Sequence, residues 1–100
     1  MPHLDAVAVI TAKTGSEEVV GDALRALVEP TRAEAGCVSY DLFESAASPG
    51  TFVTIERWRG QADLDAHMQT PHIAEALAAA GDHMDGPPAI HPLTPTGPQP

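Results

Sequence analysis

The side chains best suited to chemistry gather in residues 51–73, TFVTIERWRGQADLDAHMQTPHI. This stretch holds the chain's single tryptophan, Trp58, together with Glu56, His67 and His72. Histidine and carboxylate side chains can take up and release protons in general acid–base catalysis. A tryptophan can form the wall of a pocket for a flat aromatic molecule. These residue types point to proton transfer on a small aromatic substrate.

The spacing within residues 51–59 predicts that several of these side chains share one surface. The segment is rich in β-branched and aromatic residues, which favours a strand, and strand side chains alternate between two faces. One face then carries Phe52, Thr54, Glu56 and Trp58.

His67 is expected on the inner face of a short helix. It lies three residues after Leu64 and next to Met68, so the three side chains fall on one apolar helical face. If the helices cover the even-numbered face of the 51–59 strand, His67 and Trp58 line one cavity. We therefore name His67, Trp58 and Glu56 as candidate catalytic residues.

Each candidate also has a plainer interpretation. His67 could act as a general base for a phenolic proton, or it could be a hydrogen-bonded core histidine. Trp58 could be a pocket wall or a core side chain. Glu56 could act as an acid or base or orient His67, or it could bond only to neighbouring backbone or to a dimer-related group.

Three further residues are candidates for substrate binding. Tyr40 can bring a phenol to the cavity and Phe52 can contribute an aromatic wall. His72 falls at the edge of the apolar stripe of the next helix and is expected at the pocket rim. Core packing is the alternative for Tyr40, and a surface position is the alternative for His72.

No metal or cofactor is expected from the motifs. His67 and His72 are five residues apart with Pro71 between them, so they do not share a helical face as an i,i+4 pair does. Glu56 and the two histidines could still meet in space as a facial triad. The sequence contains no glycine-rich phosphate loop and no CxxC pair. Flavin, haem and metal nevertheless stay open as borrowed groups.

The net charge of the chain argues against two classes of binding partner. The formal net charge is −9, with five Lys and Arg against fourteen Asp and Glu. Nucleic acids and anionic membrane surfaces are bound through clustered basic residues, so neither is an expected partner. The single cysteine, Cys37, allows no intramolecular disulfide, and the N-terminus lacks a basic segment followed by a long apolar run. We therefore expect a cytoplasmic protein without a signal peptide.

The elements that must position these residues follow the order β-α-β-β-α-β. Helix-forming patterns run from Glu17 to about Ala35, where Gly36 can stop the helix, and from Thr70-Pro71 to Gly81, with Thr70 as the expected N-cap. Strands are predicted at 4–12, 37–44, 51–59 and 89–93. This order predicts a ferredoxin-like α+β fold, an antiparallel sheet with helices on one face. One domain spans 1–100, with a core at about 4–94 and a flexible tail at 95–100.

The strand at 4–12, LDAVAVITA, is apolar on both faces, although the helices can cover only one. The other face needs a second layer. A second copy of the chain would supply it, so we expect a homodimer.

Three segments resemble one known family: VEPTRAEAGCVSYDLFES (28–45), FVTIERW (52–58) and LDAHMQTPHI (64–73). Together and in this order they resemble the antibiotic biosynthesis monooxygenase domain, and most of all its small quinol monooxygenases. The resemblance implies a dimeric α+β barrel of two sheets packed face to face. Members include cofactor-independent oxygenases of polyketides and quinols, haem-degrading enzymes, and an isomerase of a phosphorylated signalling molecule.

The resemblance also narrows the chemistry. The haem degraders use an Asn on the first strand with a Trp and a His, and this chain contains no Asn. The resemblance therefore favours a cofactor-independent monooxygenase that oxidises a small aromatic, quinol or polyketide-like substrate with O₂. The alternatives are an isomerase or other proton-transfer enzyme on a small metabolite, and a non-catalytic dimeric ligand-binding accessory protein.

Overall fold

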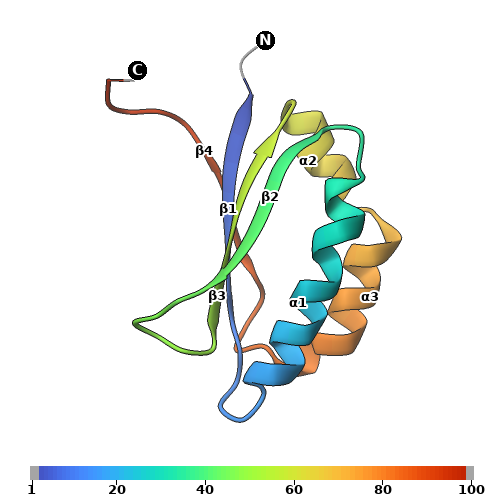
Figure 1. Cartoon of the computed structure of the whole chain (residues 1–100), viewed down its shortest axis with the longest axis vertical. Helices are drawn as coiled ribbons and strands as arrows, with labels where there is room; N and C mark the ends of the chain where they lie inside the picture. The colour runs from blue at the N-terminus through green and yellow to red at the C-terminus, as the bar shows by residue number, and fades with distance from the viewer. Residues whose placement is uncertain (1–2, 99–100) are drawn as a thin grey trace.

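A computed structural model describes residues 3–98 and shows one sheet with helices on a single side (Figure 1). The sheet is antiparallel in the order β2-β3-β1-β4. This is the ferredoxin-like α+β arrangement that the element order predicts. The elements are β1 (Leu4–Thr11), α1 (Glu17–Arg32), β2 (Cys37–Glu44), β3 (Thr51–Trp58), α2 (Gln61–His67), α3 (Pro71–Ala80), the 3-10 turn η1 (Gly81–His83) and β4 (Ala89–Leu93).

The central pair β1 and β3 decides which side chains reach the helices. Ala6 pairs with Glu56, and Ala8 pairs with Thr54. These side chains are buried, because the even-numbered face is the one that the helices cover. The helices thus cover the even-numbered face of β3, which was the condition for the predicted cavity. Glu56 and Trp58 point toward the helical layer.

The main difference from the predicted helices is at the C-terminal end of α1. The α1 helix stops at Arg32, three residues before Ala35, and a turn then leads to Gly36 and β2. Thr70 caps α3 as predicted, since its hydroxyl accepts a hydrogen bond from the Ile73 backbone N–H at 3.4 Å. The turn at 33–36 becomes important for the site because it carries a carboxylate.

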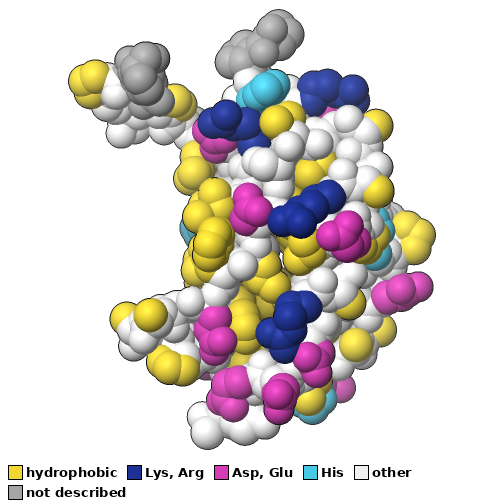
Figure 2. Space-filling model, in the orientation of Figure 1, with side chains coloured by type: hydrophobic (Ala, Val, Ile, Leu, Met, Phe, Trp, Pro, Cys, Tyr) yellow, Lys and Arg dark blue, Asp and Glu magenta, His cyan; other side chains and the backbone are white. Residues whose placement is uncertain are grey.

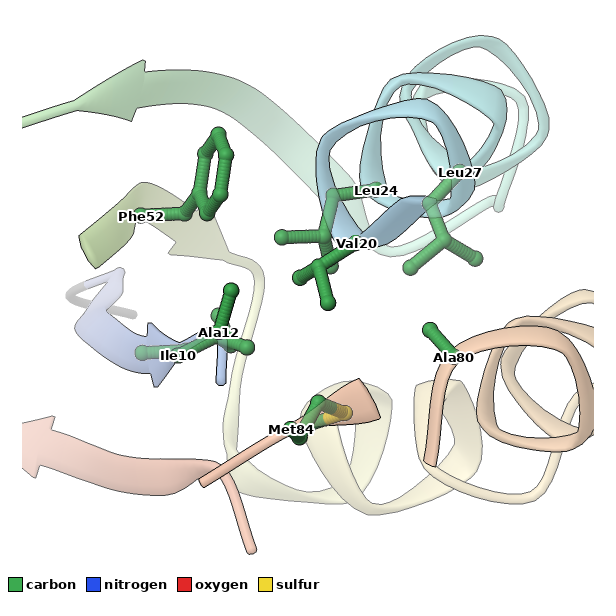
Figure 3. Packing of buried hydrophobic residues seen from close by; sticks show 9 residues of the cluster. Ile10, Ala12, Val20, Leu24, Leu27, Phe52, Ala80 and Met84 are labelled. Atoms are coloured by element: carbon green, nitrogen blue, oxygen red, sulfur yellow. The ribbon is translucent and has the colours of Figure 1, made fainter. Parts of the chain in front are cut away.

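The main core lies toward the end of the sheet opposite α2 (Figures 1 and 3). Aliphatic side chains of α1 meet β1, β3 and the segment after α3, and burying such apolar surface is the chief favourable term in folding. Phe52 belongs to this cluster. The labelled members are Ile10, Ala12, Val20, Leu24, Leu27, Phe52, Ala80 and Met84.

Gly36 allows α2 to approach the rest of the molecule closely. A Cβ atom built on Gly36 would collide with the side chain of Asp63 on α2. Asp63 is itself held by two hydrogen bonds from Arg59, at 2.9 and 3.1 Å. The absence of a side chain at Gly36 thus lets α2 bring His67 over the sheet.

The face of the sheet away from the helices is apolar and open. Figure 2 shows hydrophobic side chains gathered on that side of the molecule. Ile55 and Phe43 expose 53% and 51% of their surface there. The odd-numbered positions that make up this open sheet face include Val7, Val9, Phe43, Val53 and Ile55.

The ends of the chain add little regular structure. Strand β4 forms where it was predicted, at an edge of the sheet beside β1, although it contains Pro92. Residues 94–98 form no helix or strand, and the rest of the predicted flexible tail lies outside the described residues. No helix in the described part of the chain is long and apolar enough to cross a membrane.

Candidate active site

An apolar cavity of about 230 Å³ lies between the sheet and the helices. Aliphatic side chains of β1, α1, α3 and β4 form most of its wall. Its polar lining comes from Tyr40, Thr54, Glu56 and His67. A small number of polar groups in an apolar hollow is typical of a site that binds a small organic molecule.

The structure brings only part of the predicted set to this cavity. Tyr40, Glu56 and His67 line it. Trp58 does not; it is fully buried behind the wall, with its ring centroid 4.8 Å from that of His67. Phe52 lies in the main core, and His72 stands beside His67 with ring centroids 6.1 Å apart.

Glu56 is held by neutral donors inside the sheet. Trp58 Nε1–H donates to one carboxylate oxygen at 2.9 Å, and the Thr54 hydroxyl donates to the other at 2.5 Å. Thr54 in turn accepts from the Ala8 backbone N–H at 3.2 Å. These bonds satisfy a carboxylate that is only 5% exposed, and they pin the indole ring in place.

The carboxylate that contacts His67 is Glu34 rather than Glu56. One oxygen of Glu34, Oε2, lies 2.7 Å from His67 Nδ1 and 2.8 Å from His72 Nε2. An ionised carboxylate only accepts hydrogen bonds, so in neutral imidazoles both of these nitrogens carry the proton. Glu34 therefore sets the tautomer of both histidines.

The second ring nitrogen of His67, a residue that lines the cavity, has no hydrogen-bond partner among the described residues. Within the same residues, the only fully enclosed side-chain polar atom without a partner is the Thr31 hydroxyl. His67 Nε2 is therefore not enclosed. Because Nδ1 carries the proton, Nε2 presents a lone pair.

The two histidines converge through the meeting of two helices. His67 is the last residue of α2 and His72 is the second residue of α3. The Thr70 hydroxyl donates to the His67 carbonyl at 2.8 Å, which stabilises the turn between the helices. Because the two histidines lie on different helices, the i,i+4 spacing rule for one helical face does not apply to them.

Sequence reasoning missed Glu34. It lies in the turn after α1, two residues before the glycine over which α2 packs. The available signal was an acidic residue two positions before that glycine, within the segment 28–45 that carries the family resemblance.

Tyr40 contributes a neutral phenol to the polar lining of the cavity. Burial raises the pKa of Tyr40 far above the ordinary phenol value, and the nearby Glu56 carboxylate raises it further. No partner for its hydroxyl is found in the part of the chain that the structure describes. At neutral pH Tyr40 can therefore offer an O–H to a molecule in the cavity.

Comparison with known proteins identifies the family. The model of the family described as antibiotic biosynthesis monooxygenase matches residues 5–79. The chain belongs to this family. It is 44% identical over 72 residues to "Putative monooxygenase Rv0793" of Mycobacterium tuberculosis, covering 72% of this chain and 70% of the relative. It is 32% identical over 93 residues to "Probable quinol monooxygenase YgiN" of Escherichia coli, covering 82% and 89%.

Solved structures of similar proteins share the whole fold. The structure of Rv0793 superposes with a TM-score of 0.85 at 34% identity, covering 97% of this chain and 98% of that one. The structure of PA3566 from Pseudomonas aeruginosa gives a TM-score of 0.88 at 35% identity, with 97% of each chain covered. The antibiotic biosynthesis monooxygenase fold and the predicted ferredoxin-like fold thus agree.

The buried phenol predicts a spectroscopic result, because Tyr40 is the only tyrosine of the chain. In denaturant, tyrosinate absorbance should develop near the ordinary pKa of about 10. In the folded protein it should develop only at higher pH. Between these values the folded state holds one more proton, so stability should fall with rising pH by up to about 1.4 kcal/mol per pH unit. Tyr40→Phe should lack this component in urea titrations. Native tyrosinate formation near pH 10 would contradict the burial.

Proposed function

We propose that the protein is a cofactor-independent monooxygenase that oxidises a small aromatic or quinol substrate with O₂. The observation that carries this proposal is the unpartnered Nε2 of His67 beside an apolar cavity, with its other nitrogen bonded to Glu34. The names of relatives as monooxygenases and as a quinol monooxygenase support the substrate class.

The proposed first step is proton transfer from a substrate hydroxyl to His67 Nε2. The imidazolium so formed keeps its Nδ1–H bond to Glu34, and that charge-assisted bond stabilises it. Trp58 packs on the ring and limits its movement. Orienting His67 was one of the roles that the sequence suggested for Glu56. In the proposal Glu34 orients His67, and Glu56 with Trp58 supports the wall of the cavity.

The oxidation uses electrons of the substrate itself. The phenolate passes one electron to O₂, and the two radicals join in a C–O bond to give a peroxide anion. His67 returns its proton to the outer oxygen of this peroxide. The hydroperoxide so formed loses water, made from its outer OH and the hydrogen of the same ring carbon, and leaves a hydroxylated quinone. Quinol and O₂ thus give hydroxyquinone and water, which balances without an external reductant. An apolar site favours these steps because it keeps water from the reactive intermediates.

The cavity limits the size and charge of the substrate. Its volume of about 230 Å³ is below the roughly 300–1,000 Å³ of most ligand pockets and favours one or two fused rings. No lysine or arginine lines it, so a phosphorylated metabolite is a poor fit. The Tyr40 hydroxyl can bind a substrate oxygen, while Phe52 and His72 support the surrounding structure.

Oxygen uptake with a series of one- and two-ring quinols tests this function. His67→Gln should lower kcat/KM by about 10²–10⁴, the usual contribution of a general base. His83→Gln is the matched control, because His83 bonds to Ser16 away from the cavity. Uptake should stop without O₂ and should persist after treatment with a chelator. Full activity of His67→Gln, or saturable quinol binding with no uptake in the wild type, would overturn the proposal.

We also propose that the open sheet face packs against a second copy of the chain, as the resemblance implies. The support is its exposed apolar surface, since patches of this kind mark interaction sites. The expected cytoplasmic location stays a prediction.

Sedimentation at micromolar concentration should give a dimer. Ile55→Asp on the open sheet face should shift it to monomer, since a charge would be buried between the sheets. Val19→Asp is the control, because Val19 is 42% exposed on α1, on the helical side. A monomeric wild-type protein would contradict the proposal.

A further inference from the structure

We propose that Glu34, His67 and His72 form a binding site for one divalent transition-metal ion. Each residue offers one ligand atom, and these atoms all lie within 4.8 Å of one another. Two imidazoles and a carboxylate are a donor set that suits Zn²⁺, Co²⁺, Ni²⁺ and Fe²⁺. The sequence predicted no metal because the histidines do not share a helical face. The junction of α2 and α3 instead brings them together.

Charge favours a cation at this place. The Glu34 side chain is only 15% exposed, and its contacts are with His67 and His72 rather than with a lysine or arginine. A buried carboxylate is costly unless a cation or strong donors compensate it. Glu56 differs from Glu34, because it accepts its hydrogen bonds from Trp58 and Thr54, which are not ligands of such metals.

The geometry needs a small adjustment. Metal–ligand distances of about 2.0–2.2 Å in a tetrahedral site place ligand atoms roughly 3.4 Å apart. The present separations of 2.7 and 2.8 Å are shorter because they are hydrogen bonds. Glu34 lies in a turn outside α1 and β2, so its carboxylate can move back. The His67 and His72 ligand nitrogens, which lie within 4.8 Å of each other, also come closer as both rings bind the ion.

The site is also reachable. The His72 side chain is 20% exposed, whereas that of His67 is 3% exposed. A metal ion can therefore enter on the His72 side and keep a water there. Three protein ligands plus one open position is the arrangement of catalytic rather than structural zinc sites.

Metal binding would change what His67 presents to the cavity. A neutral imidazole with a metal on Nδ1 carries its proton on Nε2, so the lone pair is replaced by an N–H donor. The ring proton moves from one nitrogen to the other and none is lost. If the proposed function holds, a bound metal would therefore inhibit proton abstraction; that consequence rests on the proposed function, whereas the binding site does not.

Titration of chelator-treated protein with Co²⁺, followed by its visible absorption, tests the site without any turnover. We expect saturation at one Co²⁺ per chain and competition by Zn²⁺. His72→Gln should weaken binding by more than the roughly 10–100-fold that loss of an outer partner costs. His83→Gln should leave binding unchanged, because His83 is no part of the cluster.

His72 is the more exposed of the two histidines, so His72→Gln disturbs packing least and is the deciding variant. Glu34→Asp, which keeps a carboxylate, should bind more tightly than Glu34→Gln. Absence of saturable Co²⁺ binding at one per chain, or binding unchanged in His72→Gln, would overturn the metal site. Neither result bears on quinol oxidation, so the two proposals fail separately.

Discussion

One carboxylate oxygen, Glu34 Oε2, joins three segments that are distant in sequence. It contacts the last residue of α2 and the second residue of α3, while Glu34 itself belongs to the turn after α1. The contact ties the helical layer to the entry of β2. It also decides the chemistry of His67, because a proton fixed on Nδ1 leaves Nε2 bare. The cavity wall is otherwise mostly aliphatic, with Tyr40, Thr54, Glu56 and His67 as its polar residues.

Glu56 is a second buried carboxylate, and its hydrogen bonds are separate from those of Glu34. Glu56 is satisfied by Trp58 and Thr54 within the sheet and supports the wall against which His67 packs. Tyr40 completes the set as a neutral phenol whose pKa is raised by burial. The three groups differ in role because their surroundings differ. Glu34 acts on imidazoles, Glu56 holds an aromatic ring, and Tyr40 keeps its proton for donation.

Much of the fold follows from the sequence because strand alternation and helix periodicity are local properties. Alternation placed Glu56 and Trp58 on the face that the helices cover, and the spacing from Leu64 turned His67 inward. Alternation does not tell which part of a buried face adjoins a cavity. Phe52 shares the face of Glu56 but lies in the main core, and Trp58 lies behind the wall. Glu34 was missed because its role arises only when a turn meets two helix ends in space.

The same arrangement of Glu34, His67 and His72 supports two states. Without a metal it is a hydrogen-bonded pair of imidazoles that share one carboxylate oxygen. With a metal it would be a ligand set. The two states place the His67 proton on opposite ring nitrogens, so the tautomer distinguishes them.

Nitrogen-15 NMR of the imidazole rings measures that tautomer directly. For the neutral His67 ring of metal-free protein, we predict that Nδ1 carries the proton and that Nε2 is bare. Glu34→Gln should remove this preference, because an amide can also donate to the ring. A His67 ring protonated on Nε2 in the metal-free wild type would contradict the account.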